Sequence, residues 1–285
     1  MDARDEHPHS PGAELWWSDS WQLDAVSPDG VGLTVKLECY PNQNAAWFWT
    51  YVLLPDASGP VVVRDHDVNP PHQGLEIRAD GLWAELWCET ALEHWTFGLE
   101  AFGLRLDDAD AGRQEEEIGE RLPVGLDLEW ERTAPLHEHA ASWPVAGYVG
   151  PGRIHGDILL GRTRYEFDAC GENHRTWGVR DWQQRAWSFG GVADEFAFHL
   201  EGYEHVVDGF IWRGGVEATQ VQTARAEFGR QGAARLVVDD ALEITVDAVA
   251  PAPVPVDGIV YERAVCRFDV AGVALDGWSA RSATV

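Results

Sequence analysis

Residues 20–40 read Ser-Trp-Gln-Leu-Asp-Ala-Val-Ser-Pro-Asp-Gly-Val-Gly-Leu-Thr-Val-Lys-Leu-Glu-Cys-Tyr, and this stretch decides the fold class. On both sides of its central Ser-Pro-Asp-Gly, apolar and polar residues alternate, which is the period of a β-strand. The four central residues are typical of a tight turn, because Pro presets the backbone and Gly tolerates a left-handed conformation. Residues 20–40 therefore predict a β-hairpin.

The same pattern continues along the chain, with short strand-like segments about 8 to 12 residues apart and turn-forming residues between them. No stretch keeps the period of a helix over several turns, although residues 220–229 are compatible with one short helix. Such spacing is typical of β-barrels and β-sandwiches, so we expect an all-β protein. The further strand-like segments are residues 46–54, 59–67, 75–90, 95–106, 124–132, 153–161, 163–171, 187–190, 196–203, 208–215, 235–240, 242–249 and 261–270.

Three segments interrupt this pattern. Residues 1–13 are polar with Pro and Gly, which predicts a loose arm. Residues 107–120 are strongly charged, which predicts an exposed loop. Residues 133–152 are rich in Pro and Gly and are expected to cross over between two halves of the molecule. We therefore predict an N-terminal β domain of residues 1–143 and a C-terminal β domain of residues 144–285.

The composition restricts the classes of partner. The chain has 48 acidic and 21 basic residues and a formal net charge of -27, whereas a nucleic-acid-binding protein needs a basic face to neutralise phosphates. We therefore expect no nucleic-acid partner. Lys36 is the only lysine, so nearly all of the positive charge is arginine. The 15 tryptophans predict a core or a cavity lined with flat apolar rings.

The cysteines and the chain start indicate the compartment. Cys39, Cys88, Cys170 and Cys266 are far apart and form no CxxC pair, so they do not have the clustered spacing of a zinc site. We interpret them as reduced thiols. The first residues lack the apolar core of a signal peptide, and no run of apolar residues is long enough to span a membrane. We therefore expect a cytoplasmic protein without an integral membrane segment.

Sequence motifs for several common chemistries are absent. There is no glycine-rich phosphate loop, no GxSxG nucleophile elbow and no HExxH metal motif. His137 and His139 form a possible metal-binding fragment, but a solvated pair in a crossover loop is the simpler interpretation. Asp65 and Asp67 share one face of a strand, and a solvated hairpin edge is the simpler interpretation of the pair. The sequence therefore predicts neither a metal nor another cofactor.

Residues 172–182 read Glu-Asn-His-Arg-Thr-Trp-Gly-Val-Arg-Asp-Trp and combine charge with large aromatic rings. If the rings are buried, the charges beside them must be paired. One interpretation is an ion-pair network, Arg180 with Asp181 or Arg175 with Glu172, that fixes a strand corner. The other is a proton donor at an apolar cavity, where desolvation raises the pKa of a carboxylic acid and aromatic faces stabilise a cation.

Residues 171–182 resemble the G-x-x-[DH]-x-x-W-G-x-R-D-W motif of a calycin-like superfamily. This superfamily includes carotenoid 1,2-hydratases (hydroxyneurosporene synthases), AttH-like proteins and Diels-Alderase-related proteins. The likeness covers most of the chain, but only the Trp-Gly-x-Arg-Asp-Trp core is specific. The other matching positions are Trp21, Tyr40-Pro41-Asn42, Trp47, Trp49, Gly202-Tyr203 and Asp208-Gly209.

The resemblance implies a fold of two lipocalin-like antiparallel barrel or sandwich halves in tandem. In the hydratase branch an acid in this motif is thought to protonate an isolated double bond, and Asp181 is the position that corresponds to it. His174 stands where relatives often carry Asp. The order Asn173-His174-Arg175 differs from the Arg-Asp-His order common in relatives.

Together these observations predict a cofactor-free acid–base enzyme for a hydrophobic small molecule, isoprenoid- or polyketide-like, acting by hydration, isomerisation or cyclisation in a Trp-lined cavity. A carrier that binds a lipophile without changing it, and a scaffold whose tryptophans are only core, remain open as alternatives. The expected catalytic residues are Asp181 as acid, His174 as its partner or as a base orienting water, Arg180 for charge balance, and Glu172. The expected substrate-binding residues are Trp177, Trp182, Trp187, Arg175, Tyr203 and Trp212.

Overall fold

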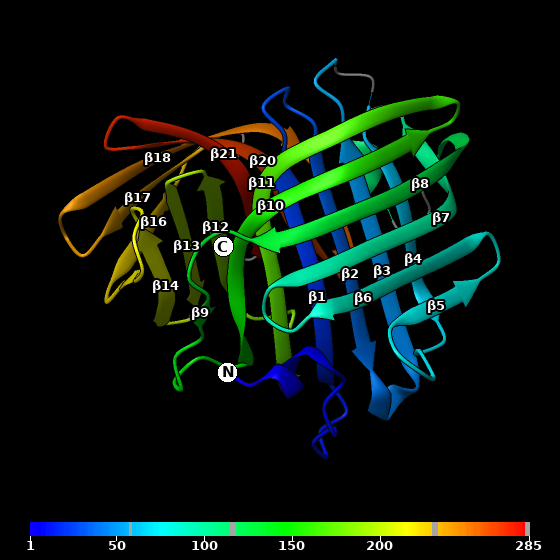
Figure 1. Ribbon diagram of the computed structural model, residues 1–285, viewed down its shortest axis with the longest axis horizontal. Helices are drawn as coiled ribbons and strands as arrows, with labels where there is room; N and C mark the ends of the chain where they lie inside the picture. The colour runs from blue at the N-terminus through cyan, green and yellow to red at the C-terminus, as the bar shows by residue number, and fades with distance from the viewer. Residues whose placement is uncertain (57–58, 115–117, 230–232, 283–285) are drawn as a thin grey trace.

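The computed structural model describes residues 1–56, 59–114, 118–229 and 233–282, and these residues form two large antiparallel sheets in tandem (Figure 1). The predicted all-β fold with two antiparallel halves in tandem is confirmed, and one of the two sheets is a half-barrel. The first sheet contains β1 (Trp17–Val26), β2 (Gly32–Tyr40), β3 (Ala45–Leu53), β4 (Val61–Val68), β5 (Glu76–Ala79), β6 (Leu82–Thr90), β7 (His94–Leu106), β8 (Gly119–Arg132), β9 (His137–Glu138), β10 (Ala146–Leu160) and β11 (Thr163–Val179). The second contains β12 (Ala186–Ala193), β13 (Phe196–Tyr203), β14 (Val206–Trp212), β15 (Thr219–Gln220), β16 (Ala224–Phe228), β17 (Ala234–Val238), β18 (Leu242–Pro251), β19 (Val254–Val256), β20 (Ile259–Val270) and β21 (Val273–Ser282). Three short 3₁₀ helices are η1 (Ala3–Glu6), η2 (Pro41–Gln43) and η3 (Asp110–Arg113).

The hairpin predicted from residues 20–40 is β1 and β2, paired from Val26 opposite Gly32 to Asp19 opposite Cys39. Its alternation separates two environments. Apolar residues such as Trp21 and Leu23 point into the core of the first sheet. The polar residues on the other face are also buried, because that face lies against the second sheet: Asp24, Thr34, Lys36 and Glu38 are each no more than 5% exposed.

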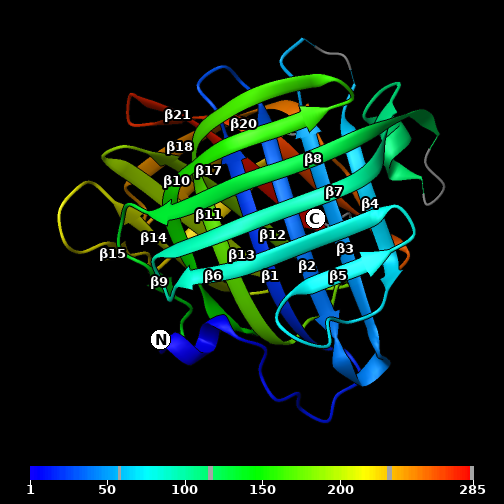
Figure 2. The same ribbon diagram turned by 45° about the vertical axis from the view of Figure 1, so that its right-hand side comes forward.

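The first sheet curves into a barrel. Its strand order is β4-β3-β2-β1-β11-β10-β8-β7-β6-β5, and β4 pairs in addition with β7, which closes the curve and leaves β6 and β5 beyond the point of closure. Figure 2 shows β6, β7, β8 and β10 crossing in front of β1 to β4 as the two faces of this barrel. Large buried side chains fill the interior, among them Trp21, Trp95, Phe97, Trp130 and Phe167.

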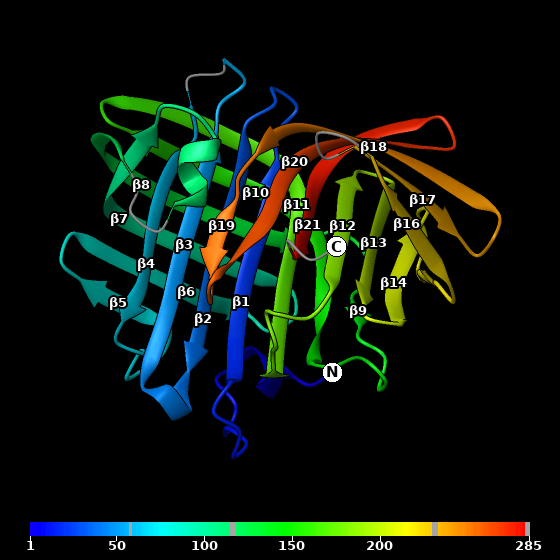
Figure 3. The same ribbon diagram turned by 180° about the vertical axis from the view of Figure 1, so that it is seen from behind.

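The second sheet has the order β15-β14-β13-β12-β21-β20-β18-β17-β16 and packs against the outside of β1 to β3 (Figure 3). An apolar cluster that includes Trp49, Val254 and Trp278 joins the two sheets. Hydrogen bonds cross the same interface, from Trp278 Nε1 to the Ala25 carbonyl at 3.0 Å and from Tyr51 Oη to the Pro253 carbonyl at 2.6 Å.

The chain passes from the first sheet to the second at residues 180–185. The last part of the expected crossover, residues 146–152, is instead the start of β10, and residues 172–179 end the long strand β11. The predicted division between 143 and 144 thus lies before the last two long strands of the first sheet. As a division into two domains it stays a prediction.

The N-terminal arm is not loose, contrary to expectation. Glu6 is fully buried, and its carboxylate accepts hydrogen bonds from the Leu92 N–H and the Tyr148 hydroxyl, each at 2.5 Å. His9 stacks on Trp177 with ring centroids 4.1 Å apart. The arm is held because it supplies a carboxylate to donors at the end of the barrel that are otherwise shielded from water.

Two further expectations are decided by the strands. The short helix expected at residues 220–229 is wrong: these residues contain β15 and β16, and Ala224 lies opposite Val238 in a ladder. Residues 107–114 form an irregular segment with η3, while residues 115–117 lie outside the described part.

All four cysteines are free thiols. Among the described residues, no helix has the length and hydrophobicity to cross a bilayer.

Candidate functional site

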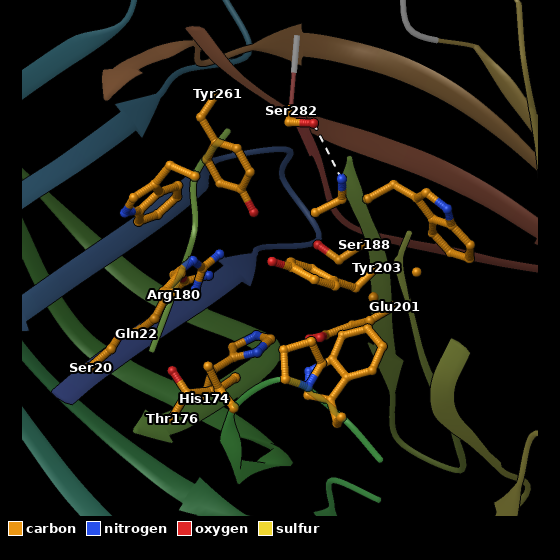
Figure 4. Close-up of a pocket in the computed structure, with 18 of the residues that line it drawn as sticks. Ser20, Gln22, His174, Thr176, Arg180, Ser188, Glu201, Tyr203, Tyr261 and Ser282 are labelled. Atoms are coloured by element: carbon orange, nitrogen blue, oxygen red, sulfur yellow. Dashed lines mark hydrogen bonds between the residues drawn. The ribbon is translucent and has the colours of Figure 1, made fainter. Parts of the chain in front are cut away.

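The candidate site is a pocket between the two sheets rather than inside the barrel. It has a cavity volume of about 90 Å³. One wall is the polar face of β1, β2 and β11, and the other comes from β12, β13, β20 and β21 (Figure 4). Residues 143–145 and the turn at 180–184 complete the rim. The same strand alternation that fills the barrel with apolar residues therefore supplies the polar side chains of the pocket.

A buried carboxylate–imidazole–carboxylate chain forms the floor. His199 Nδ1 lies 2.9 Å from Glu172 Oε2, and His199 Nε2 lies 2.7 Å from Glu201 Oε1. Burial alone would lower the pKa of His199, but the two carboxylates outweigh it and raise this pKa well above its usual value. The same contact lowers the pKa of Glu201 to about 2 against the opposing effect of burial. His199 is therefore an imidazolium held between two carboxylates.

His174 lies beside this chain and lines the pocket. Its Nε2 is 3.4 Å from Glu172 Oε2 and 3.7 Å from Asp24 Oδ2. Asp24 is in turn bound by Arg263 from the second sheet, whose Nη2 donates to Asp24 Oδ2 at 2.7 Å. Burial acts to raise the pKa of Asp24, and the charges of Arg263 and His174 overcome it and lower this pKa. The floor thus connects β1, β11, β13 and β20 through ionisable groups.

Two cations pack against one indole ring at the opposite side of the pocket. The Arg180 guanidinium lies 4.1 Å from the centroid of Trp182, and Lys36 Nζ lies 5.7 Å from the same ring. Lys36 Nζ is also 3.2 Å from Glu38 Oε2, yet burial lowers the pKa of Lys36 to about 8. Among the described residues, no carboxylate lies within ion-pair distance of the Arg180 guanidinium. Arg180 is therefore a cation available to a ligand.

Aromatic side chains form the remaining walls. Tyr203 and Tyr261 point toward the same space as His174 and Arg180 in Figure 4. Burial raises the pKa of both tyrosines, which keeps their hydroxyls protonated and able to donate. Trp143 covers the rim and makes an edge contact with Tyr203, with centroids 6.2 Å apart. The pocket is lined in addition by Trp187 and Trp278.

Seven of the residues named from the sequence line this pocket: Glu172, His174, Arg180, Asp181, Trp182, Trp187 and Tyr203. Asp181 is exposed at the mouth, and its carboxylate accepts from the Gln183 N–H at 2.9 Å and from Gln184 Nε2 at 3.0 Å. Of the two carboxylates of the motif, Glu172 is buried and Asp181 is exposed. The expected Arg180–Asp181 and Arg175–Glu172 ion pairs do not form among the described residues.

Three other predicted residues lie away from the pocket. Arg175 pairs with Asp19 at the end of the barrel and stacks on Trp21, 4.0 Å from the ring centroid. Trp177 stacks on His9 of the N-terminal arm. Trp212 packs in a separate apolar cluster and donates through Nε1 to the Gly215 carbonyl at 3.1 Å. A strand explains the split, because residues 172, 174 and 176 share one face of β11 and residues 175 and 177 share the other.

Sequence reasoning missed five ionisable residues of the pocket, which are Asp24, Lys36, His199, Glu201 and the Arg263 that pairs with Asp24. One signal was available. Lys36 is the only lysine, and it lies in the same hairpin as Asp24 at positions of equal parity. Two charges on the polar face of a hairpin normally face water, so the alternation alone did not mark them as buried.

Three groups of donors among the described residues could hold a metal ion, and one of them, His94 with Glu129 and Glu131, lies at the surface of the first sheet. Glu172, His174 and His199 offer three ligand atoms at the pocket, but both nitrogens of His199 already contact carboxylates, which requires both N–H groups. The third group is His137, His139 and Asp208. The expectation that the two histidines form a solvated pair is wrong, because each is only 8% exposed.

Comparison of the sequence with family models gives a match over residues 2–283 to a family described as a domain of unknown function, DUF7064. The chain belongs to this family. Comparison of the DUF7064 chain with curated proteins gives no match.

The fold of this DUF7064 chain is similar to solved structures. A protein from Nitrosomonas europaea described as an AttH superposes with a TM-score of 0.63 at 11% identity, covering 96% of this chain and 95% of that one. CghA superposes with a TM-score of 0.55 at 12% identity, covering 94% and 88%. CghA with Sch210972 gives a TM-score of 0.53 at 12% identity, covering 97% and 93%. At these identities the likeness establishes a shared fold.

Proposed function

We propose that this chain is an acid–base enzyme that transfers a proton on a carbonyl-containing small molecule with an apolar body, and thereby isomerises or cyclises it in the pocket between the sheets. One observation carries the proposal. His174, an imidazole whose ring nitrogens can accept or donate a proton, faces the same small space as Arg180, a guanidinium that pairs with no carboxylate of the described residues. A base and an oxyanion-binding cation are the two groups that enolisation requires.

His174 is the group that we assign to proton transfer. Its Nε2 faces Glu172 and Asp24, which stabilise the ring when it carries the proton. The second nitrogen, Nδ1, is then free to take a proton from the substrate or return it. The acid role predicted for Asp181 stays a prediction, and its exposure makes it less suited than His174 to a desolvated reaction.

Arg180 is the group that we assign to the substrate oxygen. As a carbonyl becomes an enolate, negative charge develops on this oxygen, and a guanidinium donates charge-assisted hydrogen bonds to it. Lys36, packed on the same indole ring, adds positive charge nearby. The Tyr261 hydroxyl, directed toward this space, is a further donor.

The charge arrangement argues against protonation of an isolated double bond, the reaction that the hydratase resemblance implies. That reaction passes through a carbocation. The pocket carboxylates Glu172, Glu201 and Asp24 are already paired with His199 or Arg263, whereas the free charge is the cation Arg180. The face of Trp182, which could have stabilised a substrate cation, is occupied by the protein's own cations. Carbonyl chemistry is therefore the better fit among the expected reactions.

A non-catalytic carrier fits the floor less well. Orienting a lipophile takes one or two hydrogen bonds. This floor instead buries three carboxylates, two imidazoles and a guanidinium, and each buried charge lowers stability unless it is paired. A loss of stability from this many buried charges is expected in a site that must move protons, and a carrier does not require it.

The size of the pocket constrains the ligand. A volume of about 90 Å³ holds a few water molecules, whereas pockets for drug-sized ligands measure about 300–1,000 Å³. The reacting end of the substrate therefore enters the pocket while its apolar body passes the rim. Trp143 stands on the connection between β9 and β10, and we propose that it moves when substrate binds.

The test is turnover of small molecules extracted from the protein's own host, in D₂O, with liquid chromatography and mass spectrometry. Isomerisation or cyclisation gives a new compound whose mass is that of the substrate plus the mass gained from incorporated deuterium. Hydration instead adds the mass of one molecule of the solvent water. His174→Gln should lower the rate about 10²–10⁴-fold. The exposed His72 supplies the matched control His72→Gln, which should leave the rate unchanged.

Arg180→Met is the second arm, with the exposed Arg185→Met as its control. We expect Arg180→Met to lower kcat/KM by at least ten-fold, because it removes a donor to the developing oxyanion. Turnover by folded His174→Gln at the wild-type rate would contradict the role of His174. Addition of water across an isolated double bond as the observed reaction would contradict the carbonyl assignment.

A further inference from the structure

A second buried polar cluster lies outside the pocket, on the connection between β8 and β10. His137 Nε2 and His139 Nδ1 both lie 2.9 Å from the same atom, Asp208 Oδ2. His137 belongs to β9, which pairs with the first sheet, and Asp208 belongs to β14 of the second. The cluster therefore joins two elements that are far apart in the sequence.

The residue types and spacing match metal ligation. Residues two apart in an extended segment point to the same side, so His137 and His139 present their rings to one point. Two imidazoles and one carboxylate are a common ligand set for zinc and similar divalent ions. Ligands about 2.0–2.1 Å from such an ion lie about 2.9–3.4 Å from each other, and the two observed 2.9 Å separations fall in this range.

Buried atoms without partners supply an independent observation. Asp208 is 2% exposed, and its Oδ1 has no hydrogen-bond partner in the structure. The Nε2 atom of His139 is also buried and unpartnered, but an ion bound to Nδ1 lies on the other side of the ring and does not satisfy it. Buried polar atoms are nearly always satisfied, so an unpartnered carboxylate oxygen beside two imidazoles indicates a missing ligand.

The surroundings favour a closed site. Phe210 packs on His137 with centroids 5.2 Å apart, and Trp143 stacks on His139 with centroids 6.0 Å apart. Aromatic walls of this kind exclude water and strengthen the interaction between the ion and the carboxylate. Trp143 also lines the pocket, so an ion at this cluster would fix one side of the pocket rim.

We propose that His137, His139 and Asp208 bind one divalent transition-metal ion of the zinc type, which ties β9 of the first sheet to β14 of the second. The site is structural, because its three ligands are enclosed and none of them lines the pocket. It is independent of the proposed enzymatic function.

The test is metal binding by the full chain after dialysis against a chelator. We expect one equivalent of Zn²⁺ by isothermal titration calorimetry, a rise in melting temperature on adding Zn²⁺, and visible absorption bands on adding Co²⁺. His139→Gln and Asp208→Asn should weaken Zn²⁺ binding by more than the roughly 10- to 100-fold that the loss of an outer-shell partner causes.

A matched control separates this site from the donor group of the pocket, which is Glu172, His174 and His199. His174→Gln removes a donor of the pocket group and should leave Zn²⁺ binding unchanged. Absence of Zn²⁺ binding to the wild-type chain would overturn the proposal, and this outcome does not depend on the folding of any variant. Loss of binding in His174→Gln with retention in folded His139→Gln would overturn it too, by placing the ion in the pocket.

Discussion

Replacing Arg263 with methionine tests the ionic connection between the sheets. Arg263 is 3% exposed, and it donates to Asp24 Oδ2 at 2.7 Å and to Thr34 Oγ1 at 2.6 Å. Methionine keeps most of the side-chain length and removes the charge. Asp24, 5% exposed, would keep Gln22 as a donor at 2.6 Å but would lose its guanidinium.

Removing one partner of a buried ion pair costs about 3–5 kcal/mol, because the other charge stays desolvated. This is a large part of the 5–15 kcal/mol that folded proteins typically have in total. With a urea m value near 3 kcal/mol/M, the midpoint of unfolding should fall by about 1–2 M. Far-UV circular dichroism in urea gives the measurement.

The double variant Asp24→Asn/Arg263→Met supplies the control. It leaves no unpaired charge, so its loss of stability should be smaller than that of Arg263→Met alone. Acid should act in the same direction. The pKa of Asp24 is lowered in the wild type, so this pair contributes stability above the unfolded pKa of Asp and loses it as pH falls through the folded pKa. The reasoning is refuted if Arg263→Met costs less than about 1 kcal/mol, or if the double variant loses the sum of the two single losses.

Three further predictions follow from other buried groups. The pKa of His199 is raised, so His199 contributes stability that is complete below its unfolded pKa and is lost as pH rises to the folded pKa. The advantage of wild type over His199→Gln in free energy of unfolding should therefore shrink by about 1.4 kcal/mol per pH unit between these two pKa values, and a pH-independent difference would contradict the assignment. Glu6→Ala should cost about 2 kcal/mol or more by leaving two buried donors unpaired, and should speed tryptic cleavage at Arg4, whereas the exposed Glu14→Ala should do neither. Cys39 and Cys266 should react with a thiol reagent only after unfolding, because both are buried and burial raises their pKa, that of Cys266 to about 12; rapid labelling of either in the native protein would show that the interior opens.

The sequence was most informative where one rule determined the outcome. Alternation in residues 20–40 predicts a hairpin, and the structure confirms it; the apolar side chains of this hairpin point into the barrel. It was least informative about the second face of that hairpin. A polar face normally meets water, and only the arrival of the second sheet, more than a hundred residues later in the chain, makes Asp24 and Lys36 parts of a pocket.

The sequence predicted only some of the residues of the candidate site, because the two faces of a strand again lie in different surroundings. The motif at residues 172–182 pointed to the right place, because its core lies where β11 leaves the first sheet. Its residues were then divided by strand parity: His174 faces the pocket, whereas Arg175 and Trp177 face the N-terminal arm. The sequence pattern of this segment is also compatible with a corner, in which side chains do not alternate between two faces, whereas the segment is the end of a 17-residue strand, in which they do.

The pairing of the first strand with one that follows much later has a consequence for how the chain is made. β1 pairs along its whole length with β11, from Trp17 opposite Val179 to Val26 opposite Cys170. The hydrogen-bond donor to the Glu6 carboxylate is Tyr148, 142 residues later in the chain, and the donor to the His7 carbonyl is Arg175, 168 residues later. During synthesis the first strand therefore leaves the ribosome with one edge unpaired until β11 has emerged. Closure of the barrel is a late event, and the nascent chain needs protection from aggregation until then.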